Sequence, residues 1–283
     1  MSKIIVFGAS GQLGQCLQSV STEKSITDIC YLPEEEANIL DQEALQKVFE
    51  THKPQYCINC AAYTAVDKAE DEKELADKIN VEGVANLSKL CQEFGTTLIH
   101  ISTDFVFAGN TNQPLKEEDE TAPINVYGAT KLAGEQVIPS FISNYFIIRT
   151  SWLYSEFGNN FVKTMLRLGE ERDELKVIWD QVGTPTYAVD LAECIFNLIQ
   201  TDNQQYGTYH YSNEGMTTWY DFAQAIFDIR NIKVKAHPVR TSEYITKAVR
   251  PSFSVMDKTK MKQNFNINIP HWRDSLVKCL NRL

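Results

Sequence analysis

The sequence lacks any apolar run long enough to cross a membrane. Its 283 residues contain no stretch near the roughly 18 consecutive apolar residues of a transmembrane helix. The short apolar stretch at the N-terminus leads into a glycine turn, and the small-residue cleavage site of a signal peptide does not follow. We therefore expect a soluble cytoplasmic protein with no membrane partner.

Basic residues are also scarce. The chain has 27 Lys and Arg against 37 Asp and Glu, which gives a formal net charge of −10 at pH 7. Binding to nucleic acid needs clustered basic side chains that neutralise phosphates, so this balance argues against a nucleic-acid partner. It does not exclude a small anionic substrate, which a few local basic groups can hold.

The cysteines form no disulfide framework, and the histidines form no metal-binding pattern. Seven cysteines without a repeating spacing suit a reducing compartment. Cys57 and Cys60 have C-x-x-C spacing, but they lie in a predicted buried strand, where positions three apart point to opposite faces. This placement argues against a redox pair. None of the five histidines has metal-ligand spacing to another histidine or to a cysteine, so we expect no bound metal.

The first half of the chain alternates short apolar runs with helical patterns. Strands are predicted at residues 4–7, within 26–32, and at 56–59, 97–101 and 145–149. Helices are predicted from residue 11 to about 20, from 41 to about 51, from about 72 to 94, and from 126 to 138. This alternation predicts an α/β fold with a doubly wound, Rossmann-like parallel sheet.

After Arg149 the pattern loosens, and residues 152–160 and 206–219 are predicted to be mainly loops. We therefore expect a dinucleotide-binding domain over residues 1–150 and a smaller C-terminal substrate lobe over 151–283. Part of about 176–200 is expected to return to the first domain. Ligands of such sheets bind at the carboxyl ends of the strands.

A glycine motif follows the first predicted strand and opens the first predicted helix. Gly8, Gly11 and Gly14 have G-x-x-G-x-x-G spacing. Glycine lets the backbone turn sharply and approach a pyrophosphate, while the helix N-terminus offers free N–H groups. Tight turns also need glycine, but the strand before and the helix after favour dinucleotide binding.

Two further motifs carry hydroxyl groups. Tyr127 and Lys131 are four residues apart, which places them on one helix face, where an ammonium next to a phenol favours proton exchange. The alternative is a solvated lysine beside a packed tyrosine. Ser102, Thr103 and Asp104 end the fourth strand, where a hydroxyl could bind a substrate carbonyl. The alternative there is a hydroxyl that caps the next turn.

These motifs resemble the extended short-chain dehydrogenase/reductase superfamily. Further segments make the chain similar, over nearly its whole length, to the family of dTDP-4-dehydrorhamnose reductases; they are residues 59–70, 102–109, 149–154, 158–161, 180–186 and 250–251. The resemblance implies an oxidoreductase that uses NADH or NADPH. Its substrate would be a nucleotide sugar, dTDP-4-dehydro-L-rhamnose, whose C4 ketone is reduced to give dTDP-L-rhamnose.

The resemblance also implies roles for individual residues. Tyr127 would donate the proton, Lys131 would lower the pKa of that tyrosine and hold the nicotinamide ribose, and Thr103 would orient the carbonyl. The cofactor would contact Gly8, Gly11, Gln12, Leu13 and Gly14 at the pyrophosphate, Asn38 near the adenine, and Ala61, Ala62 and Tyr63 along the cleft, besides Tyr127 and Lys131. Trp152 would pack near the sugar and Arg250 would bind the diphosphate. A core aromatic and a surface ion pair are the respective alternatives.

The chain departs from this family at several positions. Phe105 stands where the family often has tyrosine, and Asn38 replaces an acid. Some members form a dimer bridged by magnesium through glutamates, and the corresponding positions here are Cys16 and Val189, which are poor magnesium ligands. We therefore expect a monomer, or a homodimer without bridging magnesium.

Two other functions remain open at this point. One is a non-catalytic, cofactor-binding regulatory subunit, like that of methionine adenosyltransferase, and the other is a nucleotide-sugar epimerase or dehydratase of the same superfamily. The choice of cofactor depends on the three acids at residues 34–36, which follow the second strand without a basic neighbour. They favour the free ribose hydroxyl of NADH over the phosphate of NADPH, unless they form only a solvated turn.

Overall fold

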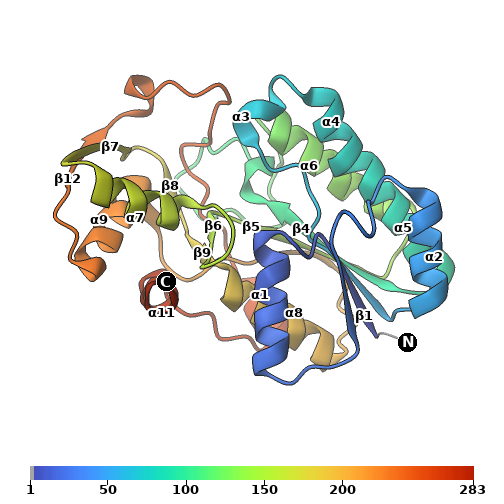
Figure 1. The fold of residues 1–283 in the computed structure, drawn as a ribbon. Helices are drawn as coiled ribbons and strands as arrows, with labels where there is room; N and C mark the ends of the chain where they lie inside the picture. The colour runs from blue at the N-terminus through green and yellow to red at the C-terminus, as the bar shows by residue number, and fades with distance from the viewer. Residues whose placement is uncertain (1–2) are drawn as a thin grey trace.

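A parallel sheet of six strands forms the centre of the computed structural model, which describes residues 3–283 (Figure 1). The strand order is β2-β1-β3-β4-β5-β10, and every neighbouring pair is parallel. The strands are β1 (Ile4–Phe7), β2 (Ile29–Leu32), β3 (Tyr56–Asn59), β4 (Thr97–Thr103), β5 (Tyr145–Thr150) and β10 (Gly207–His210). The predicted doubly wound α/β fold is confirmed.

Helices cover both faces of this sheet because its strands are apolar on both sides. Ile4 and Val6 of β1 belong to one core, together with α1 (Gln12–Glu23) and α8 (Ala188–Thr201). Ile5 and Phe7 belong to the other core, together with α2 (Gln42–His52) and α5 (Gly83–Phe94). Successive strand residues point to opposite faces, so each strand contributes to both cores.

The helix predicted from about 72 to 94 is continuous but not regular. It consists of α4 (Lys73–Asp77), a π-helical turn η1 (Lys78–Glu82) and α5, and the short α3 (Val66–Ala69) precedes it. The wider turn places Asn80, which is buried, against two other segments. Its side-chain oxygen accepts from the N–H of Tyr63 at 2.9 Å, and its amide donates to Thr130 at 3.0 Å. A π-helical turn inside an α-helix is often found next to a functional site.

Helix α6 (Val126–Val137) packs closely on this π-helical turn, and a 3₁₀ turn η3 (Ile138–Ser140) ends it. A side chain at Gly134 has no room, because a Cβ atom there would lie 2.2 Å from the carbonyl oxygen of Asn80. The obstacle is backbone, which cannot move aside as a flexible side chain can. The absence of a side chain at residue 134 therefore sets how closely α6 approaches the rest of the domain.

The second half of the chain builds a smaller lobe and also returns to the sheet (Figure 1). The lobe contains β6 (Leu153–Tyr154), α7 (Phe161–Glu171), β7 (Glu174–Ile178), β8 (Val182–Gly183), β9 (Thr186–Tyr187), β11 (Thr217–Thr218), α9 (Trp219–Arg230), β12 (Lys235–Val239) and η4 (Thr241–Glu243), and the chain ends with α10 (Thr259–Phe265) and α11 (Trp272–Arg282). Helix α8 packs against α1, and β10 pairs with β5.

The prediction of loops in residues 206–219 was wrong for β10 and β11, and in residues 152–160 for β6. These strands are only two to four residues long, too short to show a periodic pattern. The division of the chain at about residue 150 stays a prediction. Among residues 3–283, no helix is long and apolar enough to span a membrane.

The packing of α6 predicts the effect of adding one methyl group. Gly134→Ala should lower the free energy of unfolding by about 1–3 kcal/mol, although alanine favours helix formation, because its methyl group would meet the backbone of Asn80. Denaturant-induced unfolding measures this change.

The matched control is Gly169→Ala in α7, where the new methyl group would meet only the side chains of Ile232 and Phe227, which can shift. Its effect should be clearly smaller. Equal stability of Gly134→Ala and the wild-type protein would contradict the proposed close approach of α6 to the π-helical turn.

Candidate active site

The predicted glycine turn lies at the carboxyl end of β1, packed against the residues that follow β3. Gly8 has a φ of +72°, a left-handed conformation, and a Cβ atom there would lie 2.6 Å from the N atom of Ala61. A Cβ atom on Gly14 would lie 2.6 Å from the carbonyl oxygen of Gly8. Gly11 caps α1 without a side chain over the first amides of the helix. These features leave room for a pyrophosphate against the N-terminus of α1.

The side chains of Gln12 and Leu13 already have partners within the protein. The side-chain amide of Gln12 donates to the carbonyl of Leu153 at 3.2 Å, and its oxygen accepts from Asn160 at 2.8 Å. Leu13 is buried in the core under the turn. The side chain of Gln12 therefore joins the glycine turn to the second lobe, a role that the sequence did not indicate.

The segment after β3 is held by buried polar side chains. The N–H of Ala61 donates to the side chain of Asn59 at 3.0 Å, and the N–H of Tyr63 donates to Asn80. The hydroxyl of Tyr63 donates to Glu72 at 2.6 Å, and this hydrogen bond raises the pKa of Tyr63 to about 12. Ala61 and Ala62 are half-buried, and they line the edge of the sheet beside the glycine turn.

Asn38 lies after β2, in the turn that leads into α2. Its side-chain oxygen accepts from the N–H of Leu40 at 2.9 Å and so stabilises this turn. Glu34, Glu35 and Glu36 precede it and are exposed, and among residues 3–283 none of the three forms an ion pair with a basic side chain. This turn therefore keeps its negative charge.

Thr103 and Tyr127 meet at the carboxyl end of β4. The hydroxyl of Thr103 accepts from the N–H of Phe105 at 3.2 Å and caps the short helix η2 (Asp104–Val106), which is the structural alternative described above. The same side chain also lies next to the phenol of Tyr127 and lowers its pKa. The ring of Phe105 packs edge-on against the ring of Tyr127, with 5.5 Å between centroids. Thr103 thus caps the turn and contacts the phenol as well.

Gly128 allows Tyr127 and Thr103 to lie close together. A Cβ atom on Gly128 would lie 2.2 Å from the carbonyl oxygen of Phe105, so any side chain there would push α6 away from η2 at the end of β4. Asn125 caps the helix by accepting from the N–H of Gly128 at 2.7 Å. Both residues fix Tyr127 in the first turn of α6.

The pKa of Tyr127 differs from the expectation. Burial raises it to about 12, while the nearby Thr103 hydroxyl acts to lower it and the carboxylate of Asp104 acts to raise it. The expected lowering by Lys131 is not seen. The physical reason is that the Lys131 side chain turns inward, where its Nζ atom donates to the carbonyl of Ile101 at 2.7 Å. Tyr127 is therefore protonated at neutral pH and can act as a proton donor.

Lys131 is buried, with only 2% of its surface exposed. Burial lowers the pKa of its amine to about 8, whereas Glu135 and Cys60 raise it. Its Nζ atom lies 3.3 Å from Nε2 of His100, and Nδ1 of that ring lies 3.1 Å from the amide of Asn59. The alternative of a solvated lysine does not hold for this side chain.

Sequence reasoning gave no role to three polar residues near these groups, namely Asn59, His100 and Asp104. Each of them is almost fully buried. Burial raises the pKa of Asp104 to about 6, against the hydrogen bond from Thr103 at 3.1 Å. The signal that could have identified Asn59 and His100 is a polar residue inside an otherwise apolar strand, because such a residue needs a specific partner.

Trp152 stacks on Trp219 of the second lobe. The ring centroids are 3.5 Å apart and the planes are 7° from parallel. Trp152 has a φ of +45°, and a Cβ atom on Gly183 would collide with its indole. The side chain is half-buried, so it forms part of the packing and leaves some of its surface open.

Arg250 forms the ion pair that was the alternative to a diphosphate contact. Its guanidinium donates to both oxygens of Asp67 in α3, at 3.2 and 2.6 Å, and lowers the pKa of that carboxyl. The main-chain N–H groups of Lys247 and Ala248 also donate to Asp67 at 3.0 Å. The connection between β12 and α10 is thereby fastened to α3 (Figure 1).

The cysteines lie as their strand positions suggest. Cys57 belongs to one core and Cys60 packs against the other, so their thiols point to opposite faces of the sheet. All seven cysteines are free. Cys16 and Val189 are buried. Among residues 3–283, no group of three or more His, Cys, Asp or Glu side chains could hold a metal ion.

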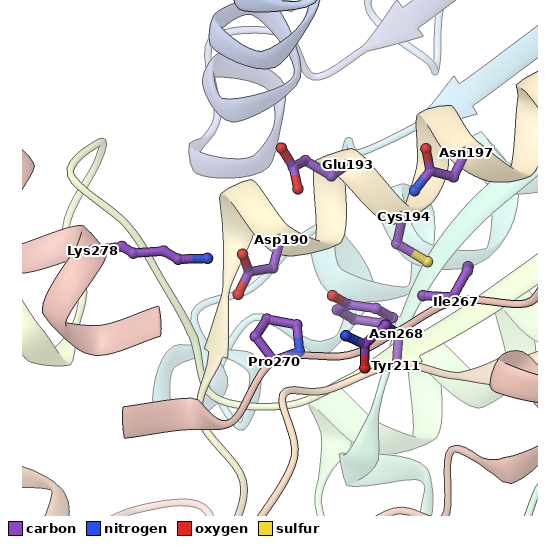
Figure 2. A pocket seen from close by; sticks show the side chains of 9 residues that line it. All are labelled: Asp190, Glu193, Cys194, Asn197, Tyr211, Ile267, Asn268, Pro270 and Lys278. Carbon is purple, nitrogen blue, oxygen red and sulfur yellow. The ribbon is translucent and has the colours of Figure 1, made fainter. Parts of the chain in front are cut away.

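A cavity of about 240 Å³ lies elsewhere, between α8, α11 and residues 267–270 (Figure 2). Asp190 and Glu193 of α8 and Lys278 of α11 line it. The carboxylate of Asp190 already accepts from Asn213 at 2.7 Å and from Ser275, so it is committed to holding these segments together. None of the residues predicted to act in catalysis lines this cavity.

Comparisons with known proteins identify the relatives of this chain. The family model described as the RmlD substrate binding domain matches residues 2–283. The dTDP-4-dehydrorhamnose reductase of Escherichia coli K12 is 40% identical, over 99% of this chain and 97% of that protein. A crystal structure of dTDP-4-dehydrorhamnose reductase from Bacillus anthracis, in complex with NADP, has a TM-score of 0.95 at 42% identity and covers 100% of both chains. That of Clostridium acetobutylicum has a TM-score of 0.94 at 41% identity and covers 99% of this chain and 98% of its own.

The contacts of Asp67 predict how the segment around Arg250 is held. Asp67→Ala removes the bonds to two main-chain amides and to the guanidinium, so the segment should open more often. Tryptic cleavage after Lys247 should become about tenfold faster or more, since hydrogen bonds to a charged group contribute about 1.5–3 kcal/mol.

Asp71→Ala is the matched control, because the one ion pair that Asp71 forms among residues 3–283 is with Lys247, and both side chains are exposed. It should leave the cleavage rate within about twofold of wild type. Equal rates for the two variants would show that Asp67 does not fasten the segment.

Proposed function

Since the chain belongs to the RmlD substrate binding domain family, we propose that it reduces the C4 ketone of dTDP-4-dehydro-L-rhamnose with NADH or NADPH and forms dTDP-L-rhamnose. The full-length likeness to dTDP-4-dehydrorhamnose reductases carries this proposal. The juxtaposition of Thr103, Tyr127 and Lys131 at one edge of the sheet supports it.

The residues present fit a dinucleotide. A Cβ atom at Gly8 or Gly14 would fill the turn, and the first amides of α1 carry no side-chain cap. We propose that the pyrophosphate is held by the main chain from Gly8 to Gly14, with Ala61, Ala62 and Tyr63 along the cleft, Asn38 near the adenine and Lys131 at the nicotinamide ribose. When bound, the nicotinamide supplies the hydride that reduces C4.

Tyr127 is the proposed proton donor to the oxygen at C4. A phenol whose pKa is raised to about 12 is fully protonated near neutral pH, yet it remains far more acidic than the alcohol that forms at C4, so it can protonate the alkoxide. Thr103 lies next to this phenol and would orient the ketone oxygen beside it. The two hydroxyls would therefore hold one oxygen atom between them.

Trp152 and Arg250 are the proposed contacts to the sugar and to the diphosphate. Trp152 comes just after the carboxyl end of β5, the edge of the sheet where ligands bind, and its indole is only partly buried. Arg250 is paired with Asp67, so it would have to share its guanidinium between this carboxylate and a diphosphate. We propose further that any homodimer forms without bridging magnesium, since Cys16 and Val189 are buried and apolar in their surroundings.

The assignment of the proton donor predicts the effect of removing one hydroxyl. Tyr127→Phe should lower kcat by about 10²-fold or more, with little change in cofactor affinity, because the phenol acts on the reacting oxygen. Steady-state rates with the dTDP-linked keto sugar and a cofactor-binding titration measure the two quantities.

Tyr154→Phe is the matched control for loss of a tyrosine hydroxyl. The hydroxyl of Tyr154 is buried and has no hydrogen-bond partner among residues 3–283, so this variant should keep wild-type turnover. Near-normal turnover by Tyr127→Phe would refute the proton donor. Absence of turnover in the wild-type protein, with intact cofactor binding, would favour the non-catalytic regulatory function.

The acidic turn after β2 predicts the cofactor preference. Glu34, Glu35 and Glu36 are exposed, and no basic side chain pairs with them among the residues that the structure describes. Carboxylates within a Debye length, about 8 Å at physiological salt, repel a 2′-phosphate and can accept from a 2′-hydroxyl. We expect NADH to serve at least as well as NADPH, and its advantage to widen at low salt.

Measuring kcat/KM for both cofactors at two ionic strengths tests this expectation. The Bacillus anthracis relative was crystallised with NADP, so a result in favour of NADH would set this protein apart from the cofactor seen in that structure. Replacing Glu34 and Glu35 by Gln should shift the ratio towards NADPH and weaken its salt dependence. A preference of the wild-type protein for NADPH that grows at low salt would mean that a basic group reaches the 2′-phosphate.

A further inference from the structure

A line of buried polar side chains runs from the end of β3 to Lys131. Asn59 and His100 have 1% and 0% of their surface exposed. The side-chain nitrogen of Asn59 lies 3.1 Å from Nδ1 of His100, and Nε2 of the same ring lies 3.3 Å from Nζ of Lys131. Neither Asn59 nor His100 has a role in the function proposed above, and polar groups this deeply buried are retained only with specific partners.

The direction of these hydrogen bonds is fixed at the Asn59 end. The N–H of Ala61 donates to the side chain of Asn59 at 3.0 Å, and only the amide oxygen can accept it. The amide nitrogen must therefore face His100, whose Nδ1 atom accepts. Burial lowers the pKa of His100 well below its usual range, so the ring is neutral and carries its single proton on Nε2.

That proton points at the amine of Lys131. An ammonium has three donors and no acceptor, so it cannot accept from the N–H of His100. A neutral amine has a lone pair and can accept. Every contact from Ala61 to Lys131 is therefore satisfied only when the lysine has given up a proton.

Other charged or titratable groups also face Lys131. Glu135 lies one turn further along α6, and its carboxylate is paired with Arg149 of β5 at 2.7 Å, while Cys60 follows β3. Both groups favour the ammonium, whereas burial opposes it. The N–H group of His100 also disfavours the ammonium. The His100 ring is itself the titratable group that β4 contributes next to Lys131.

We propose that Asn59 and His100 are positioning residues that hold Lys131 in place and weaken its affinity for its proton. This inference rests on the proposed function, in which Lys131 serves the reaction. Tyr127 gives up one proton in each turnover and has to regain it. A neighbouring lysine that exchanges its proton readily near neutral pH suits that cycle.

The proposal fixes the tautomer of one histidine, which can be observed without substrate. In protein labelled with ¹⁵N-histidine, the ring nitrogens of His100 should show the Nε2–H tautomer. The chain has five histidines, and His100→Gln identifies the signal that belongs to residue 100. The Nδ1–H tautomer in the wild-type protein would overturn the proposal, even if no variant folded.

Asn59→Asp exchanges the donor and acceptor roles in the hydrogen bonds between residues 59, 100 and 131, with almost no change in side-chain shape. One carboxylate oxygen still accepts from Ala61, and the other now accepts from Nδ1–H of His100. The ring then turns its lone pair on Nε2 towards Lys131, which can donate as an ammonium. The expected result is a switch of the His100 signal to the Nδ1–H tautomer.

The same variant should shift the pH profile. The pKa of Lys131 is lowered to about 8, so the wild-type kcat should fall as the pH rises through that region and the ammonium is lost. In Asn59→Asp the ammonium gains an acceptor, and the basic limb should move upward by about one pH unit. His100→Gln should move it in the same direction, because its amide oxygen can face the lysine.

A double variant separates this mechanism from a simple effect of the added charge. Asn59→Asp combined with His100→Gln should shift no further than His100→Gln alone, because both changes act through the same contact. Additive shifts would show a plain electrostatic effect and would overturn the proposal. Asn86→Asp places a carboxylate at another buried asparagine, which contacts Ile39 and not His100, and it should leave the basic limb unchanged.

Failure of this inference can be told apart from failure of the proposed function. The tautomer measurement needs neither substrate nor cofactor, whereas turnover of the keto sugar by the wild-type protein tests the function alone. A switched tautomer with an unchanged basic limb would also overturn the proposal, because Lys131 would then not respond to the ring.

Discussion

Helix α6 can pack closely on η2, just after β4, and on the π-helical turn η1 because two of its residues have no side chain, and the candidate site depends on these contacts. A Cβ atom at Gly128 would collide with the carbonyl of Phe105, and one at Gly134 with the carbonyl of Asn80. Because both positions are glycine, the first turn of α6 brings Tyr127 to Thr103, and the second turn brings Lys131 to the carbonyl of Ile101. A displacement of α6 would separate the groups that the proposed proton transfer requires.

Placing charged and polar groups inside the domain is costly, and the structure offsets that cost with dense hydrogen bonding. Arg149 and Glu135 form a buried ion pair in which two guanidinium nitrogens donate to the carboxylate, and Ser102 donates to the same group. Such a pair is tolerated only when its remaining polar atoms find partners. It joins α6 to β4 and β5. The hydrogen-bonded line of Asn59 and His100 does the same from β3, so α6 is held by buried polar contacts as well as by apolar packing.

The two lobes are joined at points that border the proposed ligands. Gln12 of the glycine turn bonds to Leu153 and Asn160, and Asp67 in α3 holds the segment around Arg250. Residues expected to bind ligands therefore already have protein partners. For Gln12 this leaves the main chain free for a pyrophosphate, while Arg250 would divide its guanidinium between two anions.

The sequence by itself determined the parallel sheet, its first five strands and the glycine turn, because these follow from local apolar periodicity and from backbone constraints at glycine. It also indicated Thr103, Tyr127 and Lys131, because their spacing on a strand end and a helix face is local. Only the tertiary structure showed β10, the partners of Gln12 and Arg250, and the inward turn of Lys131. It also revealed the line from Asn59 through His100. These features depend on contacts between residues distant along the chain, and the direction of each hydrogen bond is set by what packs beside it, which no local pattern records.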